Sequence, residues 1–372
     1  MRKIPVRTRS LITLGTSAAL ALTLAACGSD SKDTSSASGS SSSKALSGTI
    51  TGAGSTFAAP IYSEWGANLK DSQGLTVNYQ ATGSGDGVAQ FTAGTVDFGA
   101  SDSALADDEL KAASAKATPL DIPSAFGAVT ISYNVNGVEK GLKLDGATAA
   151  DIFLGKVKTW NDKEITALNS GVTLPSTPIT VCHRSDSSGT TKLFTTFLAA
   201  YSPSWKSGPG VDKSVDWPVG TGAKGNDGVA ACVKQTDGAI GYVEEAYALQ
   251  NNFTFANVKN KSGEFIEPTL ESTTAAGDGL TVPDDLRFSA IDSPNKAAYP
   301  IASATFLLVY QDLCKAGQSA DKAKLVKGWL DYALGDGQKV ASTINYAPLP
   351  APLLEKAKAK VASITCNGAA IS

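Results

Sequence analysis

Histidine and methionine are scarce in this sequence, whose 372 residues include one of each, His183 and Met1. A metal site that rests on several histidines is therefore excluded, as is any mechanism that needs two of them. A metal-dependent phosphatase would also require clusters of histidine and carboxylate groups, and the chain does not offer them. Its polar chemistry has to come from Ser, Thr, Asp and Arg side chains and from main-chain amides.

Two familiar phosphate and hydrolase motifs are also missing. The chain has no Gly-Lys-Ser/Thr loop of the kind that holds nucleotide phosphates. No Gly-x-Ser-x-Gly elbow surrounds Ser84, since Thr82 occupies the first glycine position. Acyl transfer by a serine ordinarily needs a histidine base, and only His183 is available. An extracellular phosphate-ester hydrolase or a serine hydrolase is therefore the less favoured class.

Charge is low as well, with 18% charged residues and a formal net charge of −3. Such a balance argues against a nucleic-acid partner. Hydrophobic residues make up 42% of a chain that is longer than one hydrophobic core ordinarily supports. We therefore expect a soluble α/β protein with two domains.

The N-terminal 44 residues are typical of an export signal followed by a flexible linker. Residues 1–26 combine a basic start with a short apolar stretch, and Leu24-Ala25-Ala26-Cys27 resembles a bacterial lipobox. The alternative is an ordinary signal peptide followed by a chance cysteine. Residues 27–44 are then a lipidated Cys27 and a Ser-rich tether that cannot bury a core. We expect an exported protein, lipid-anchored to the outer face of the bacterial cytoplasmic membrane. Loss of the four positive charges in residues 1–26 would change the formal charge from −3 to −7.

Four further cysteines, an even number in an exported protein, predict disulfides. Three pairings are possible for Cys182, Cys232, Cys314 and Cys366. We favour Cys182–Cys232 and Cys314–Cys366, because each pair would lie within one domain. Their spacing fits no zinc motif, and we expect neither a metal nor a cofactor.

Short β-branched runs alternate with helical stretches along the rest of the chain, which predicts an α/β fold with a parallel sheet. Strands are expected at 48–51, 75–79, 128–133, 179–181, 239–243 and 306–310, and helices at 57–70, 188–200, 227–234, 320–334 and 351–364.

Three loops each place Gly with Ser or Thr between a strand and a helix. They are Gly52 to Thr56, Gly83 to Gly85, and Ser187 to Thr190. The first amides of a helix have no partner within the helix and carry partial positive charge, so anions bind there. One such loop is weak evidence, because Ser and Thr are also ordinary helix caps. Three of them predict a tetrahedral oxyanion held by several helix N-termini.

Two charged residues, Arg184 and Asp102, indicate which kind of oxyanion the helix N-termini would bind. Arg184 lies just before the third loop, where its guanidinium could grip two oxygens of the anion while Asp186 holds it from behind. Asp102 would face the anion with a carboxylate, which makes sense only for a ligand with a proton to donate. Hydrogen phosphate has one at neutral pH and sulfate does not. An acceptor that faces sulfate would cost several kcal/mol.

Several motifs together resemble the substrate-binding lipoprotein of the bacterial high-affinity phosphate ABC transporter, the PstS family. The resemblance covers nearly everything from about Gly48 to Ile364. The motifs are Gly52-Ala53-Gly54-Ser55-Thr56-Phe57-Ala58-Ala59-Pro60, Gly83-Ser84-Gly85, Val96-Asp97-Phe98-Gly99-Ala100-Ser101-Asp102, Arg184-Ser185-Asp186-Ser187-Ser188-Gly189-Thr190, Gly225-Asn226-Asp227-Gly228, Gly238-Ala239-Ile240-Gly241-Tyr242-Val243-Glu244 and Tyr346-Ala347-Pro348-Leu349-Pro350.

The resemblance implies a type II periplasmic-binding-protein fold, in which crossover strands join two lobes around a ligand cleft. The expected parts are lobe I at 45–126 and 299–372, and lobe II at 127–298. The family pattern implies that phosphate is bound by Thr56, Phe57 (through its amide), Ser84, Asp102, Arg184, Ser188, Gly189 and Thr190, with Asp186 orienting the arginine.

The implied function is capture of inorganic phosphate and its delivery to the permease subunits of an ABC transporter, without covalent chemistry. A monomer that closes over a desolvated anion is expected. A binding protein for another oxyanion, such as sulfate or molybdate, is the main alternative, and Asp102 argues against it. An adhesin or signalling role for the same fold stays open.

Overall fold

The computed structural model describes residues 46–371, which belong to one compact unit that begins at Ser43. The expected signal peptide, Cys27 and the Ser-rich tether lie outside the described residues.

The body begins with strand–helix–strand units. β1 (Gly48–Gly54) pairs in parallel with β2 (Leu75–Ala81) and with β3 (Phe98–Ser101). The connecting helices are α1 (Ala59–Gln73) and α2 (Ser84–Ala93). This part of the sheet is parallel, as expected, and each helix begins close to the end of the preceding strand.

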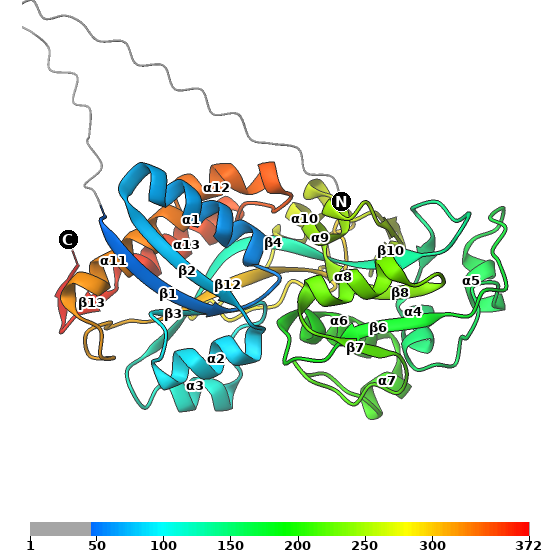
Figure 1. Ribbon diagram of the computed structural model, residues 1–372, viewed down its shortest axis with the longest axis horizontal. Helices are drawn as coiled ribbons and strands as arrows, with labels where there is room; N and C mark the ends of the chain where they lie inside the picture. Colours follow the sequence, from blue (N-terminus) through cyan, green and yellow to red (C-terminus); the bar gives the residue numbers. More distant parts are fainter. Residues whose placement is uncertain (1–45, 372) are drawn as a thin grey trace, which may run out of the picture. The chain divides into compact units, whose positions relative to one another are not determined.

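One long strand links the two halves of the main sheet. β4 (Pro119–Asn134) pairs antiparallel with β12 (Ala302–Tyr310) up to Ala128 and with β8 (Ala239–Glu244) from Val129 on. The order of the sheet is β2-β1-β3-β12-β4-β8-β6-β7, with β9 also paired to β4. In Figure 1, β4 passes from the half that contains β1 to the half that contains β8. We call the half built on β1, β2, β3 and β12 lobe I, and the half built on β6, β7 and β8 lobe II.

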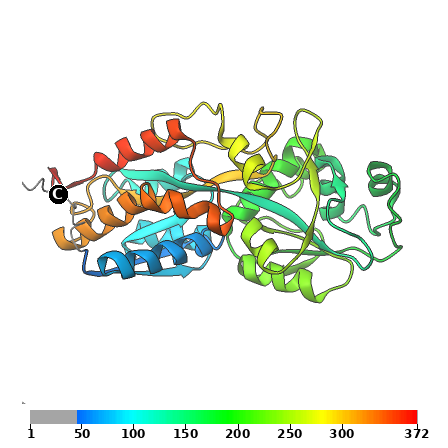
Figure 2. The ribbon, with the colours of Figure 1, turned by 90° about the horizontal axis from the view of Figure 1, so that it is seen from above.

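Lobe I carries helices on both faces of its sheet, as Figures 1 and 2 show. The apolar face of α1 is buried against an aromatic cluster in which Trp65, Tyr62 and Trp329 meet at ring-centroid distances of 5.6 to 5.8 Å. The other elements of lobe I are α3 (Asp107–Ala113), α11 (Ala320–Ala333), α12 (Asp336–Ala341), the 3-10 helix η1 (Ser342–Ile344), α13 (Ala351–Ala362), β13 (Thr365–Cys366) and β14 (Ala369–Ala370).

Lobe II repeats the same plan around a shorter sheet. β6 (Thr180–Arg184) pairs in parallel with β7 (Thr221–Ala223) and with β8. Its helices are α4 (Gly146–Phe153), α5 (Lys163–Leu168), α6 (Gly189–Tyr201), α7 (Pro203–Ser207), α8 (Gly225–Gln235) and α9 (Glu245–Gln250), and its short strands are β5 (Lys143–Leu144), β9 (Thr254–Phe255), β10 (Asn257–Lys259) and β11 (Phe265–Ile266). The helix α10 (Leu270–Gly277) packs against β4 and β12 instead. Tyr242 stacks on Phe194 with ring centroids 4.5 Å apart, which fixes α6 against β8.

The two favoured disulfides are confirmed. Cys182 in β6 is bonded to Cys232 in α8, and Cys314 is bonded to Cys366 in β13. The two bridges therefore close loops of similar length, with sequence separations of 50 and 52 residues.

The main departure from expectation is the direction of the central strands. The sheet is not parallel throughout, because β12 runs antiparallel to both β3 and β4. β4 is also much longer than the expected strand 128–133. Pro123 interrupts the strand pattern there, and the register with β12 shifts beside it, between Thr305 and Phe306. A proline is tolerated in a strand at such an irregularity.

Candidate functional site

The N-termini of four helices, two from each lobe, meet where the lobes face each other. The loop before α1 contacts α8, since the amide of Asn226 donates to Thr56 Oγ1 at 3.1 Å. The loop at α2 contacts the loop before α6, since the amide of Gly85 donates to the carbonyl of Ser187 at 3.0 Å. The three expected loops therefore converge. The fourth, at α8, was recognised in the motif pattern but had no assigned role.

Asp102 lies at the centre of this convergence, directly after β3, and is 1% exposed. Its Oδ1 accepts hydrogen bonds from the hydroxyls of Ser55 and Thr305, the latter at 3.0 Å. Its Oδ2 lies 3.3 Å from Ser84 Oγ and 3.5 Å from Thr190 Oγ1. Burial raises the pKa of Asp102, although the Ser55 and Thr305 hydroxyls act in the opposite direction. The carboxylate is thus a lone acceptor among hydroxyl donors.

Arg184 ends β6 and is 3% exposed. Its Nε donates to Asp186 Oδ1 at 2.7 Å and its Nη2 to Asp186 Oδ2, so the carboxylate grips one edge of the guanidinium. Its Nη1 lies 3.4 Å from Thr190 Oγ1, on the side of the helix N-termini. Burial raises the pKa of Asp186, but the hydrogen bond and the charge of Arg184 outweigh it and hold that pKa below its usual value. Asp186 therefore holds the Nε–Nη2 edge of the guanidinium, while Nη1 lies on the side of Thr190.

Thr56 and Phe57 form the turn that leads into α1. Asn226 Nδ2 donates to Thr56 Oγ1 at 2.8 Å, and the Tyr247 hydroxyl donates to the Thr56 carbonyl at 2.7 Å. The carbonyl of Phe57 accepts from the Tyr346 hydroxyl at 2.5 Å, and the two rings meet edge to face. The carbonyls of this turn are thereby held from the far side, which fixes the direction in which its amides point.

Close approach of the two lobes depends on a glycine at the start of α6. A Cβ added to Gly189 would collide with Ser84 Oγ and would lie 2.8 Å from the backbone nitrogen of Asp102. Ser188, the cap of this helix, accepts from the amide of Thr191 at 3.0 Å. Its hydroxyl hydrogen remains able to turn toward a ligand.

All eight expected ligand residues lie in this one region of the body, and the residues Thr56, Ser84, Ser188 and Thr190 are each less than 5% exposed. Four further polar residues join them without having been assigned: Ser55, Asn226, Tyr247 and Thr305. Ser55 stood in the first Gly/Ser/Thr loop and Asn226 in a quoted motif, so both carried a signal. Thr305 and Tyr247 carried none.

Two residues that neighbour the site in the sequence, Asp86 and His183, do not point into it. Asp86 is exposed and accepts from Gln90 Nε2 at 2.7 Å, so it does not point into the site. His183 is partly buried, stacks on Trp217 with ring centroids 4.7 Å apart, and bonds the Arg184 carbonyl through Nδ1 at 3.0 Å. Burial lowers its pKa, so the imidazole supplies no charge to the site at neutral pH.

The arrangement offers many donors and one acceptor. Arg184 is neutralised by Asp186, so Asp102 leaves the polar cluster with a formal negative charge. A ligand that enters it must therefore accept hydrogen bonds at most of its atoms and donate one to Asp102. A tetrahedral oxyanion that carries a proton satisfies both demands, whereas a fully deprotonated one would leave Asp102 unpaired.

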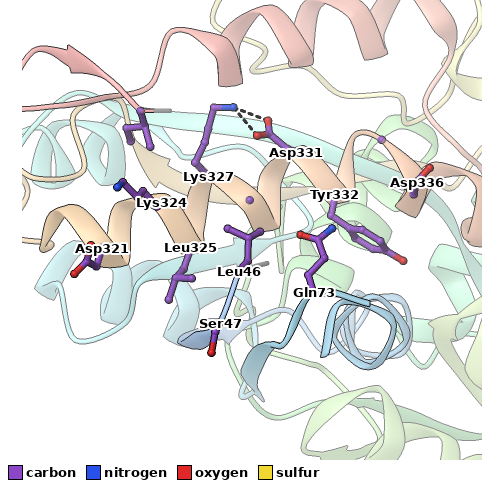
Figure 3. Close-up of a pocket in the computed structure, with 13 residues that line it drawn as sticks. Leu46, Ser47, Gln73, Asp321, Lys324, Leu325, Lys327, Asp331, Tyr332 and Asp336 are labelled. Atoms are coloured by element: carbon purple, nitrogen blue, oxygen red, sulfur yellow. Dashed lines mark hydrogen bonds and ion pairs between the residues drawn. The ribbon is translucent and has the colours of Figure 1, made fainter. Parts of the chain in front are cut away.

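A large pocket elsewhere in the body does not share these properties. It has a volume of about 690 Å³ and lies against α11, between Leu46 at the start of the body and Gln73 at the end of α1 (Figure 3). Its charged side chains include Lys327 and Asp331, which bond each other at 2.6 Å. None of the residues that line it belongs to the site around Asp102.

Residues 46–371 include neither a metal-binding cluster nor a membrane-spanning helix. No group of three His, Cys, Asp or Glu side chains in this range is placed to hold a metal ion. None of the helices there combines the length and the apolar character needed to cross a bilayer.

Comparison with known proteins agrees with the geometry. Residues 39–336 match the model of the PBP superfamily domain. The phosphate-binding protein PstS of Xylella fastidiosa is 39% identical over 336 residues, which are 90% of this chain and 90% of that protein. PstS of Pasteurella multocida is 40% identical over 315 residues, 84% of this chain and 89% of that protein. The chain belongs to the PstS family. The resemblance inferred from the motifs is thereby confirmed.

Solved structures show the same fold as this PstS family member. A high affinity periplasmic phosphate-binding protein (PfluDING), bound with phosphate, matches with a TM-score of 0.71 and 23% identity over 86% of this chain and 97% of that one. A phosphate-binding protein from Stenotrophomonas maltophilia matches with a TM-score of 0.64 and 22% identity over 84% and 94%. The expected two-lobed periplasmic-binding fold is confirmed.

Proposed function

We propose that this chain captures inorganic phosphate outside the cytoplasm and delivers it to the permease subunits of an ABC transporter. Its family membership supports this function, because the PstS relatives are phosphate-binding proteins. The observation that carries the proposal is the placement of Asp102 as a lone buried acceptor among the N-termini of four helices. That combination suits an anion that both accepts and donates hydrogen bonds, as HPO₄²⁻ does.

Each side chain has a distinct role in this proposal. The hydroxyls of Ser and Thr and the amides of the helix N-termini donate to phosphate oxygens, and Arg184 adds a charge-assisted bond. Asp102 accepts the phosphate proton, while Asp186 orients the guanidinium. The proposed ligand set is Thr56, Phe57, Ser84, Asp102, Arg184, Ser188, Gly189 and Thr190.

Binding is non-covalent and reversible in this account, so the chain is not an enzyme. Closure of the lobes removes the anion from water, which strengthens each hydrogen bond that holds it. We further propose lobe boundaries near 126/127 and 298/299, which are supported by the change of partner in β4 between Ala128 and Val129. Lipid attachment at Cys27 and a monomeric state belong to the same proposal.

Capture of sulfate is the competing function, and Asp102 opposes it. Sulfate has no proton at neutral pH, so its oxygens would face the carboxylate without a hydrogen bond. An extracellular phosphate-ester hydrolase is a more distant alternative. A chromogenic phosphate ester should therefore bind weakly and show no turnover.

The test is calorimetric titration with phosphate of the wild-type protein and of Arg184→Met. The substitution removes a buried, charge-assisted donor, and we expect affinity to fall about a hundredfold, or roughly 3 kcal/mol. Lys327→Met is the control, because Lys327 pairs with Asp331 within α11, away from the site. Equal phosphate affinity in wild type and Arg184→Met would refute the site assignment.

A further inference from the structure

An ion pair bridges the lobes beside the proposed site. Lys213 lies in the loop between α7 and β7 of lobe II, and its Nζ contacts the carboxylate of Glu109 in α3 of lobe I. The two side chains are 6% and 23% exposed. Lysine is seldom buried to this extent, and when it is, a charged partner is ordinarily present. The burial of Lys213 therefore depends on the opposite lobe.

The lysine end of the pair is connected to the anion site. The carbonyl of Lys213 accepts from the amide of Ser188, the cap of α6, at 2.8 Å. The neighbouring Asp212 carbonyl lies 3.5 Å from the hydroxyl of Thr195 in the same helix. The loop that carries the ammonium is thus attached to the helix whose N-terminus belongs to the proposed anion site.

The glutamate end is connected to the site from the other lobe. Glu109 Oε2 accepts from the amide of Ala106 at 2.9 Å, which closes the turn that follows Asp102. Within that turn the amide of Leu105 donates to the buried Asp121 at 2.9 Å. Glu109 is therefore held in place, with Oε1 left for the lysine.

We propose that the Lys213–Glu109 pair is a latch that holds the lobes together around a bound oxyanion and slows its release. The proposal rests on the proposed function, and it gives the two residues a positioning role without contact to the ligand. Separation of the lobes would break the pair, because its partners belong to different lobes. Breaking it while the lobes stay closed would leave Lys213 charged and poorly solvated, which is costly.

Loss of the Lys213–Glu109 pair should affect the release of phosphate more than its association. The pair forms only as the lobes close, so its loss should raise the rate of phosphate dissociation and leave the association rate nearly unchanged. We expect Lys213→Met and Glu109→Gln each to release phosphate about tenfold faster, which corresponds to about 1.4 kcal/mol. Met keeps the apolar stem of the lysine, and Gln keeps an acceptor for the amide of Ala106.

Stopped-flow dissociation and calorimetry with inorganic phosphate test the latch. The double variant Lys213→Met/Glu109→Gln should release phosphate no faster than either single variant, and the exchanged pair Lys213→Glu/Glu109→Lys should recover part of the slow release. Lys206→Met is the control, because Lys206 is exposed in α7 of the same lobe.

Different results would refute the latch and the proposed phosphate-binding function. Single-variant dissociation rates equal to that of the control would overturn the latch, and so would additive effects in the double variant. A wild-type protein that does not bind phosphate would refute the proposed function itself. Thermal unfolding midpoints close to that of the wild type would show that the altered rates do not reflect misfolding.

Discussion

Replacement of Asp102 by Asn is predicted to change which anion the protein prefers. The side chain is 1% exposed and is surrounded by the hydroxyls of Ser55, Ser84 and Thr305. Asn has nearly the same shape, but it exchanges a charged double acceptor for one neutral acceptor and one NH₂ donor. The neighbouring hydroxyls can turn to accept from that donor, so the fold should tolerate the change.

The magnitude follows from the bonds at this position. A hydrogen bond to a charged group contributes about 1.5–3 kcal/mol, and one between neutral groups about 0.5–1.5 kcal/mol. Phosphate should therefore bind Asp102→Asn about tenfold more weakly. Sulfate gains relative to phosphate, because the carboxylate gives it no hydrogen bond, whereas the Asn NH₂ group can donate one worth about 1.5–3 kcal/mol. The preference for phosphate over sulfate should shrink by at least about a hundredfold.

Calorimetric titration of wild type and variant with each anion at pH 8 measures this preference. Asp121→Asn is the matched control, because Asp121 is also a buried carboxylate of lobe I but accepts from the amide of Leu105. It should lower stability without changing the preference. Since burial raises the pKa of Asp102, sulfate should also compete better as the pH falls in wild type, and not in Asp102→Asn. An unchanged ratio of affinities in Asp102→Asn would refute the reasoning.

Three further predictions concern other parts of the body. Gly189→Ala should weaken phosphate binding at least about tenfold, because the new Cβ would collide with Ser84 and Asp102 of the opposite lobe. Unchanged affinity in calorimetry would contradict this. Burial raises the pKa of Glu245 from 4.5 to about 7, so its contribution to stability is present below pH 4.5 and is lost as the pH rises to 7. Glu245→Gln should therefore unfold in urea at pH 8 with about 3 kcal/mol more free energy than wild type, and no difference should remain at pH 4. Loss of the Cys314–Cys366 bridge through paired Ser substitutions should cost about 2–5 kcal/mol of unfolding free energy in the same assay, and a loss well below that range would show that lobe I does not depend on it.

Local features of the sequence were enough to find most of the site. A Gly with Ser or Thr between a strand and a helix marks a helix N-terminus, and this signal is contained within a few residues. This signal marks the loops at Ser84 and Ser188: Ser84 and Thr190 both contact Asp102, and Thr190 also contacts Arg184. The disulfide pairing followed from a similarly simple premise, that each bridge stays within one domain.

Contacts that depend on tertiary structure could not be found in the same way. Thr305 binds Asp102 across 203 residues, and it sits in a buried strand whose pattern indicates only core. Tyr247 binds the Thr56 carbonyl across 191 residues, and no motif surrounds Tyr247 itself. The strand β4 was also expected to be shorter, because Pro123 breaks a pattern that only its pairing with β12 restores.

The most direct test of the account is a calorimetric titration of the wild-type protein with phosphate, alone and in a large excess of sulfate. We predict one tight site per chain whose affinity for phosphate is the same in both titrations at neutral pH. Displacement of phosphate by sulfate with comparable affinity would contradict it, because the buried carboxylate of Asp102 would then have no part in the choice of anion.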